Sequence, residues 1–181
     1  MTVEPKRIEC KGLTWTLRCP CEGDAAELSR LRVQMDAETE NMDREAGEGV
    51  LSPEDFEGRI EADTQADKSL FLVAEADGSI VGYARCAGNT LSRFRHKADF
   101  GICIAQKYWG HGVGRVLMEH ILTWADSAGI TKISLSVLGT NAKAIRIYER
   151  FGFVQEGVLV NDRRHRDGNY YDTVLMGRFR G

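Results

Sequence analysis

The chain has 181 residues, of which 43% are hydrophobic, and a formal net charge of −3 at pH 7. This length predicts a single domain that spans residues 1–181 and has an apolar core. The acidic balance disfavours a nucleic-acid-binding protein, and no apolar run approaches the roughly 18 residues of a membrane span.

The N-terminal residues and the cysteines suggest a compartment. The opening stretch, MTVEPKRIECKG, contains no apolar signal segment, so we expect a cytoplasmic protein with no membrane partner. The five cysteines show no CxxC spacing, and we expect reduced thiols. Cys19 and Cys21 flank one proline, but without a second pair they make a poor metal site, and we predict no metal.

One strand and two helices are predicted for the first third of the chain. The segment LTWTLRC (13–19) alternates between apolar and polar residues, as a strand does. Asp24 is a candidate cap for a helix with apolar residues at helical spacing. These residues are Leu28, Leu31 and Met35. A second helix is predicted to begin at SPED (52–55), with Ser52 at the N-cap and Pro53 in the first helical position.

The middle of the chain predicts a hairpin and a strand–helix–strand unit. Asp77 and Gly78 lie between two alternating apolar runs within 69–88, a composition that favours a tight hairpin turn. Strands are then predicted over 98–105 and 132–139, with an amphipathic helix between them. This connection should make the two strands parallel neighbours.

The C-terminal part completes a mixed sheet. A helix is predicted over 141–153, closed by Gly152, and two strands follow over 154–160 and 170–179. The chain as a whole gives about seven strands and about four helices. Because hairpins and a parallel pair occur together, we predict an α+β fold.

Three alternating glycines, Gly110, Gly112 and Gly114, stand between a predicted strand and the following helix. A helix N-terminus presents unpaired N–H groups and the positive end of the helix dipole, and glycines let a phosphate approach these groups. The alternative is a tight turn that needs glycine only for its positive φ.

Two nucleotide-binding motifs fit this loop poorly. A P-loop would continue with Lys and then Ser or Thr, where Arg115 and Val116 stand. A dinucleotide fingerprint that begins at Gly110 would need Gly or Ala at position 115.

Two segments resemble signatures of the GNAT N-acetyltransferases. QKYWGHGVGRVLMEHIL (106–122) resembles the acetyl-coenzyme A loop, often written Q/R-x-x-G-x-G/A, with Trp109 in place of Gln or Arg. NAKAIRIYERFGF (141–153) resembles the N-x-x-A-x-x-x-Y-x-x-x-G-F helix. The resemblance covers about residues 13–179. It implies the GNAT acyl-CoA N-acyltransferase fold, with a mostly antiparallel sheet whose two central strands splay apart.

The resemblance also implies an acetyl-CoA site in that splay, with no metal. Pantetheine would pair with a strand edge, and the pyrophosphate would lie on the glycine loop. The residues expected to bind acetyl-CoA are Ile102, Cys103, Ile104, Gly110, His111, Gly112, Val113, Gly114, Arg115, Asn141 and Tyr148. Asn141 and Tyr148 lie two helical turns apart, on one face. Tyr148 is the expected general acid, because a phenol with an ordinary pKa near 10 is protonated at neutral pH.

The general base and the acceptor remain open. The candidates for the base are Glu38, Glu40, Asp99 and His96, with bound water as the alternative. The acidic stretch 36–67 holds 12 Asp and Glu against two Arg, and it would attract a cationic amine or simply be a solvated face. A cluster of three arginines would either bind an acceptor carboxylate or lie in solvent at a hairpin tip. These arginines are Arg163, Arg164 and Arg166.

The leading hypothesis is an acetyl-CoA-dependent N-acetyltransferase that acts directly on a primary amine of a small molecule, or of a peptide or protein N-terminus. A non-catalytic acyl-CoA-binding sensor of the same fold is the alternative, and a nucleotide-binding regulator is a weaker one. We expect no nucleic-acid partner. A homodimer is a further hypothesis.

Overall fold

The structure is a computed structural model that describes residues 3–180. Its strands are β1 (Lys6–Cys10), β2 (Leu13–Arg18), β3 (Leu70–Ala76), β4 (Ser79–Gly88), β5 (Lys97–Ile104), β6 (Lys132–Leu138), β7 (Val154–Arg164) and β8 (Tyr170–Phe179). Its α-helices are α1 (Ala25–Glu38), α2 (Pro53–Gln65), α3 (Val113–Ser127) and α4 (Ala142–Arg150).

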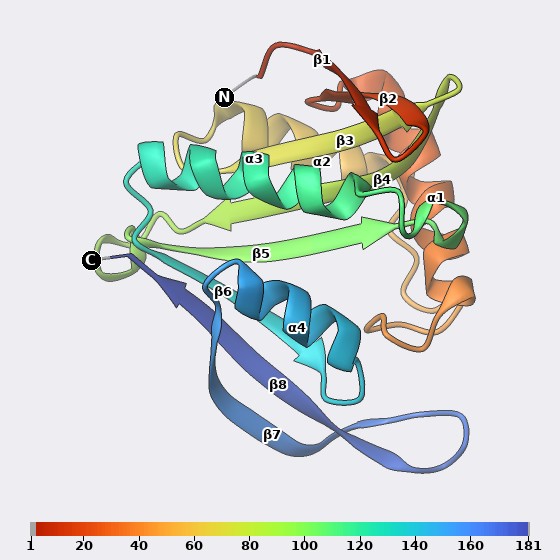
Figure 1. The fold of residues 1–181 in the computed structure, drawn as a ribbon, viewed down its shortest axis with the longest axis vertical. Coiled ribbons are helices and arrows are strands. Elements are labelled where there is room, and N and C mark those ends of the chain that lie inside the picture. Colours follow the sequence, from red (N-terminus) through yellow and green to blue (C-terminus); the bar gives the residue numbers. More distant parts are fainter. Residues whose placement is uncertain (1–2, 181) are drawn as a thin grey trace.

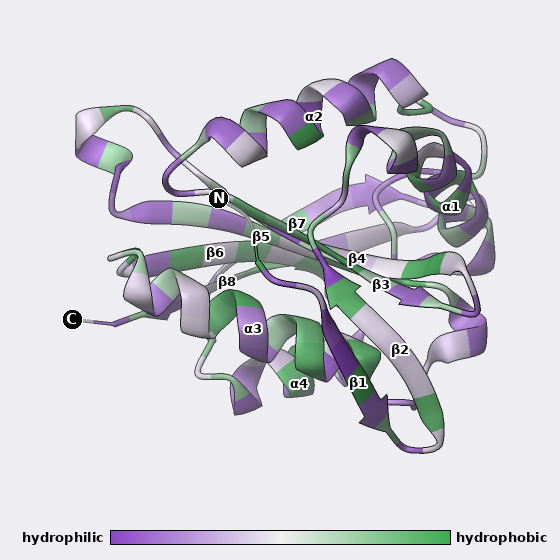
Figure 2. Cartoon of the chain, turned by 90° about the horizontal axis from the view of Figure 1, so that it is seen from above, coloured by the Kyte–Doolittle hydropathy of each residue, from purple (hydrophilic) through white to green (hydrophobic). Residues whose placement is uncertain are grey.

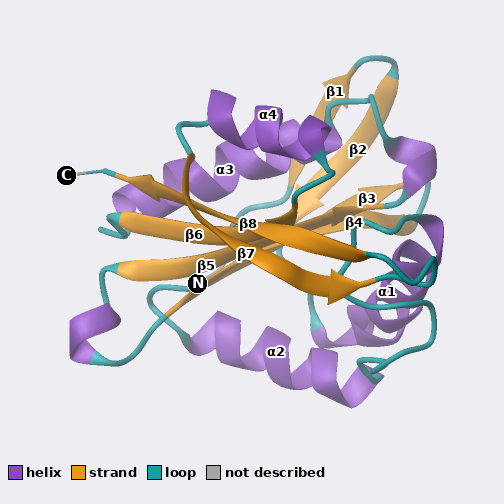
Figure 3. Ribbon diagram, turned by 90° about the horizontal axis from the view of Figure 1, so that it is seen from below, coloured by secondary structure: helices purple, strands orange, loops and turns teal. Residues whose placement is uncertain are grey.

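All eight strands form one sheet, in the order β1-β2-β3-β4-β5-β6-β8-β7 (Figure 1). Neighbouring strands are antiparallel except β5 and β6, which are parallel. Helices α1 and α2 cover one face of the sheet, and α3 and α4 cover the other (Figures 2 and 3). The predicted α+β fold with a mostly antiparallel sheet is confirmed. Within residues 3–180, no helix combines the length and the apolar character that crossing a bilayer requires.

Strand β1 is missing from the sequence-based prediction. Its five residues, KRIEC, include a single aliphatic side chain, Ile8, so no alternation marks it as a strand. It pairs with β2 through a turn in which Lys11 (φ 48°) and Gly12 (φ 76°) are both left-handed. This is the conformation of a two-residue primed hairpin turn.

The start of α1 also differs from the prediction. Asp24 precedes the helix, but its side chain makes no cap hydrogen bond. Its two carboxylate oxygens instead accept hydrogen bonds from the Arg18 guanidinium at 2.6 and 2.9 Å, and one also accepts from the Cys21 N–H at 2.7 Å. A charged donor is a stronger partner than a backbone N–H, so Asp24 is directed to Arg18 and away from capping.

Helix α2 begins as predicted. The Ser52 hydroxyl accepts a hydrogen bond from the Asp55 N–H at 3.2 Å, and the Asp55 carboxylate accepts one from the Ser52 N–H at 2.8 Å. This reciprocal capping box, with Pro53 in the first turn, fixes the start of the helix. Phe56 and Ile60 are buried on its sheet-facing side.

The other elements follow the prediction with one extension. Asp77 (φ 51°) and Gly78 (φ 75°) form the predicted primed turn between β3 and β4. Strand β7 continues four residues beyond the predicted end at 160, to Arg164. Asn161 adopts a left-handed φ of 55° at an irregularity in the β7–β8 pairing, which lets a polar run continue along β8.

The sheet separates the hydrophobic core into two halves, and β5 contributes side chains to both. Phe100 belongs to the larger half, between the sheet and α3, and Ile102 and Ile104 pack against it. Cys103 points to the other face and belongs to the half under α1 and α2. The alternation of a strand therefore gives β5 two chemically different sides.

Strands β5 and β6 separate after a short contact. Their pairing is limited to Lys97–Asp99 against Lys132–Ser134. Further on, β5 stays with β4 as far as Ile104, whereas β6 stays with β8 as far as Leu138. No described strand covers the edge of β5 that faces this gap, so the predicted splay is confirmed.

Candidate functional site

The open edge of β5 carries backbone groups at two of its last three residues. The Ala105 N–H donates to the Val81 carbonyl at 3.0 Å, toward β4. Because successive residues of a strand direct their backbone groups to opposite sides, Cys103 also pairs toward β4, whereas Ile102 and Ile104 face the gap. The structure therefore supports an edge role for Ile102 and Ile104 and places the backbone of Cys103 away from it.

Two of the three glycines have left-handed backbones. Gly110 has φ 85° and Gly112 has φ 83°, which ordinary side chains rarely tolerate. Gly112 is the N-cap residue of α3, and no side chain caps this helix. The first helical hydrogen bond runs from the Val116 N–H to the Gly112 carbonyl at 3.1 Å. The N–H groups of residues 113–115 precede it and are available to an anion.

Gly114 has no conformational reason to be glycine. It lies in the first turn of α3, and an added Cβ would contact Ile102 and Ile104 side chains at 3.7 Å, an ordinary van der Waals distance. A glycine inside a helix costs about 0.5–1 kcal/mol relative to alanine. Close approach of a ligand to the helix N-terminus is the explanation that remains, and it favours the anion hypothesis at this position.

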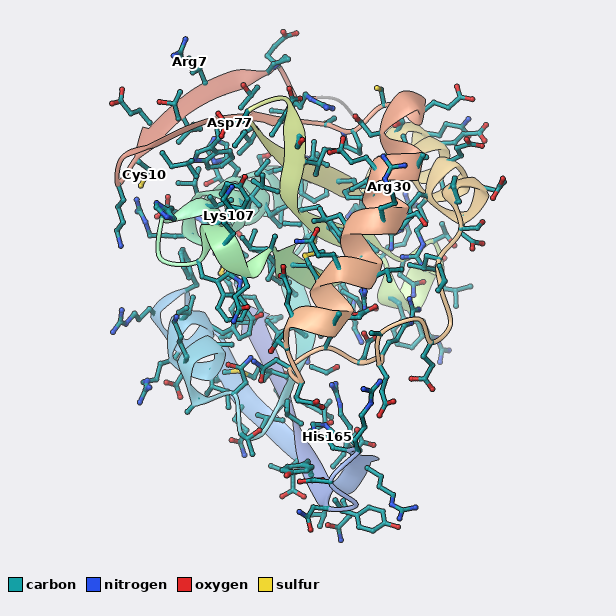
Figure 4. All side chains as sticks on the ribbon, turned by 90° about the vertical axis from the view of Figure 1, so that its right-hand side faces the viewer. Arg7, Cys10, Arg30, Asp77, Lys107 and His165 are labelled. Atoms are coloured by element: carbon teal, nitrogen blue, oxygen red, sulfur yellow. The ribbon has the colours of Figure 1, made fainter. Side chains whose placement is uncertain are left out.

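The turn between β1 and β2 supports the glycine loop from behind. A Cβ on Gly112 would come within 2.8 Å of the Cys10 sulfur, and the His111 ring nitrogen Nδ1 lies 3.3 Å from the Lys11 carbonyl. Figure 4 shows Cys10 beside the loop that leads into α3. Sequence reasoning missed Cys10 and Lys11, because only the sheet topology brings residues about a hundred positions apart together.

Asn141 precedes helix α4 and Tyr148 lies within it, and Asn141 has a structural role. Its side-chain oxygen accepts a hydrogen bond from the Ala144 N–H at 3.1 Å and caps the helix. Tyr148 is half-buried and packs edge-on against Phe153, with ring centroids 5.9 Å apart. Burial, helped by the neighbouring Cys103 thiol, raises the pKa of Tyr148 to about 12. The phenol therefore holds its proton at the gap.

A polar cluster lies under α1, beside Tyr83 and Cys103. The Arg32 guanidinium donates to Asp36 at 2.9 Å and also to Asp43. It interacts with the Tyr83 hydroxyl and lies near the Cys103 thiol. Burial raises the pKa of Cys103 to about 11, so this thiol stays neutral. Cys103 thus lies between the cluster and the phenol on α4.

The four candidate bases are not equivalent. His96 and Asp99 lie where β5 still pairs with β6, at the closed end of the splay. Glu38 has both oxygens occupied, by the Gln106 N–H at 2.6 Å and the Gln34 amide at 2.7 Å. Glu40, in the connection between α1 and α2, lines two cavities at this end of the molecule. The geometry therefore favours Glu40 among the four.

Two cavities lie between the α1–α2 connection and the tip of the β7–β8 hairpin, where Figure 4 shows His165. The smaller has a volume of about 410 Å³ and reaches Leu138 and Thr140 at the end of β6. The larger has a volume of about 690 Å³ and is lined by residues of the acidic stretch and of the predicted arginine cluster. Glu40, His165 and Arg166 line both. The structure thus brings the two oppositely charged segments together.

Known proteins resemble the chain in sequence and in fold. Residues 36–153 match the family model of the Acetyltransferase (GNAT) family. The L-amino acid N-acetyltransferase AaaT of Escherichia coli is 34% identical over 110 residues, 59% of this chain and 66% of AaaT, so the match covers just under two thirds of that relative.

Two solved structures share the fold. A GNAT-family acetyltransferase from Streptococcus pneumoniae superposes with a TM-score of 0.87 at 29% identity, over 92% of this chain and 99% of that one. A GNAT-superfamily phosphinothricin acetyltransferase from Sinorhizobium meliloti, in complex with AcCoA, superposes with a TM-score of 0.80 at 19% identity, over 92% and 89% of the two chains.

Proposed function

Since the chain belongs to the GNAT acetyltransferase family, we propose that it is an acetyl-CoA-dependent N-acetyltransferase. It transfers the acetyl group directly to a primary amine of a small molecule or of a peptide N-terminus. One observation carries the proposal: the open edge of β5 runs between the uncapped N-terminus of α3 and the neutral phenol of Tyr148.

The residues of the splay fit an elongated anionic thioester. The N–H groups of residues 113–115 would hold the pyrophosphate, with Gly110 and Gly112 giving the loop its shape. The carbonyl of Ile102 and the N–H of Ile104 would pair with the pantetheine amides, like an added strand, which leaves the N–H of Ile102 for the thioester. Acetyl-CoA supplies the thioester carbonyl and the thiolate leaving group.

Groups at the gap would polarise the thioester carbonyl and donate a proton to the leaving thiolate. A backbone N–H on the open edge at Ile102–Ile104 polarises the thioester carbonyl. The amine nitrogen attacks the carbonyl carbon, a C–N bond forms and the C–S bond breaks. Tyr148 gives its phenolic proton to the departing sulfur, and the proton released by the amine leaves to Glu40 or to water.

The acceptor enters from the α1–α2 side, where both cavities lie. The names of relatives give the range of acceptors, since they include L-amino acid, phosphinothricin and spermidine N-acetyltransferases. All three names specify an amine of a small molecule. A small amine is accordingly the first acceptor class to assay, and peptide N-termini are the second.

Thiol release with a panel of primary amines tests the proposal. The Tyr148→Phe variant should lower kcat by about 100-fold or more, while the Kd for acetyl-CoA changes by less than about threefold, because the phenol acts on the leaving group. Tyr170→Phe, on an exposed tyrosine of β8, is the matched control. A protein that binds acetyl-CoA but acetylates no amine would support the alternative of an acyl-CoA sensor.

A further inference from the structure

The larger cavity contains an incompletely paired arginine. Arg44, in the connection between α1 and α2, lines this cavity. Its nitrogen Nη1 is shielded from solvent and has no hydrogen-bond partner among residues 3–180. A buried donor without a partner costs about 1–3 kcal/mol, and more when the group is charged. A long side chain at a cavity wall can recover this energy by turning toward an anion that enters the cavity.

Other charged groups of the lining already have partners. Asp36 and Asp43 accept from Arg32. The Arg166 guanidinium donates to Glu45 at 2.7 Å. Arg32 offsets one of the two charges of Asp36 and Asp43, and Arg166 offsets that of Glu45; Arg44 differs from both arginines because its Nη1 has no acceptor among residues 3–180.

The other arginines of the hairpin tip are also engaged. Arg163 donates to the Thr173 hydroxyl at 3.1 Å and to the Met42 carbonyl at 3.3 Å. The Arg164 guanidinium lies over the Tyr170 ring, 5.9 Å from its centroid. Arg163 and Arg164 therefore mainly stabilise the hairpin tip. The nitrogen without a hydrogen-bond partner is Nη1 of Arg44.

The cavity also offers a negative charge. The Glu40 side chain is 72% exposed, and one of its oxygens lies 3.6 Å from the His165 ring nitrogen Nδ1. Glu40 lines both cavities, and the smaller one extends from it to the end of β6, immediately before α4. A ligand with an ammonium group near Glu40 and an anion near Arg44 would therefore match both signs.

From these contacts we infer that the acceptor is an amine that also carries a carboxylate, as a free α-amino acid does, and that Arg44 binds the carboxylate. The inference rests on the proposed acetyltransferase function and names its substrate class. The cavity volumes of about 410 and about 690 Å³ lie within the roughly 300–1,000 Å³ of small-molecule sites. Polyamines and other purely cationic amines lack the group that Arg44 would bind.

The test compares common L-amino acids, each paired with its carboxamide, by thiol release from acetyl-CoA. For the best pair, the wild-type protein should favour the acid about 10- to 100-fold in kcat/KM, the range expected from one charge-assisted hydrogen bond. Arg44→Gln should remove this preference by raising KM for the acid, so that kcat/KM for the acid falls to about the value for the amide. Arg30→Gln is the control, because Arg30 is exposed on the outer side of α1 (Figure 4).

The outcomes separate the inference from the function on which it rests. Preferred turnover of amides, polyamines or peptide N-termini, or equal losses on acid and amide in Arg44→Gln, would overturn the carboxylate site and keep the acetyltransferase. If no amine is acetylated, the proposed function fails. Thermal shifts with the same amino acids in the presence of coenzyme A then decide the site: stabilisation of the wild type but not of Arg44→Gln supports it, and no stabilisation refutes it.

Discussion

The indole N–H of Trp109 donates a 2.7 Å hydrogen bond to the carbonyl of Ile104, so the residue that leads into the glycine loop is tied to the open edge of β5. The Lys143 ammonium of α4 lies over the same indole, 5.9 Å from the ring centroid. Trp109 thus joins the edge strand, the loop and α4, the three elements that we propose to surround acetyl-CoA. This explains how a tryptophan replaces the polar residue of the resembled signature.

Replacing Trp109 with Phe should weaken acetyl-CoA binding about fivefold, because one neutral hydrogen bond contributes about 1 kcal/mol to the position of the loop. Calorimetry measures the Kd directly. Lys143→Met keeps the hydrogen bond and removes the ammonium, and it should have a smaller effect. Tighter binding by Trp109→Phe would show instead that the indole competes with the ligand for the Ile104 carbonyl.

The pH dependence should show no sign of Tyr148 below about pH 11. Burial raises its pKa to about 12, and the proposed mechanism needs the protonated phenol, which is therefore present over the usual range. The ratio of wild-type to Tyr148→Phe kcat should stay constant between about pH 7 and about pH 10. A ratio that falls by half near pH 10 would mean an ordinary phenol and would contradict the burial described above.

Asp24 should make the free energy of unfolding depend on pH in the acidic range. Although burial alone would raise it, hydrogen bonds from Arg18 and from the Cys21 N–H hold the pKa of Asp24 below its ordinary value. A lowered folded-state pKa contributes stability that is present above the unfolded value of about 3.9 and is lost as the pH falls through the folded value.

Asp24→Asn should therefore lower the free energy of unfolding by about 2 kcal/mol at neutral pH and reduce the further loss between about pH 5 and about pH 2. Urea unfolding at several pH values measures both effects. Asp67→Asn, at an exposed aspartate, is the control and should change neither. If Asp24→Asn loses as much stability as the wild type between about pH 5 and about pH 2, the lowered pKa of Asp24 is refuted.

The outer edge of β7 is the place where the hypothesis of a homodimer is best tested. This terminal strand of the sheet carries four exposed apolar side chains. They are Val154, Val158, Leu159 and Val160. An unpaired edge with apolar residues invites pairing with a second chain. Val160→Lys should convert a dimer to a monomer in light-scattering chromatography, whereas Leu91→Lys, at another exposed apolar residue, should not; a wild-type monomer would refute the hypothesis.

Local chemistry explains why much of the fold is predictable. The Asp77-Gly78 turn and the N-cap at Ser52 are each set by residues a few positions apart, and the structure has both as predicted. Strand β1 and the contact of Asp24 with Arg18 escaped prediction although their partners are also near in the sequence. The five mostly polar residues of β1 give no periodic signal, and the sequence does not show that Asp24 binds Arg18 on β2 instead of capping α1.

The sequence by itself determined the order of the elements after β1, the glycine loop at the start of α3, and the positions of Asn141 and Tyr148 at α4, because spacing along one chain fixes which side chains share a turn or a face. Only the tertiary structure decided the rest. It separated the edge residues Ile102 and Ile104 from Cys103, and it placed Cys10 behind the loop. It also brought Arg44 and the hairpin tip to one cavity, since such contacts depend on how the sheet registers segments far apart in the chain.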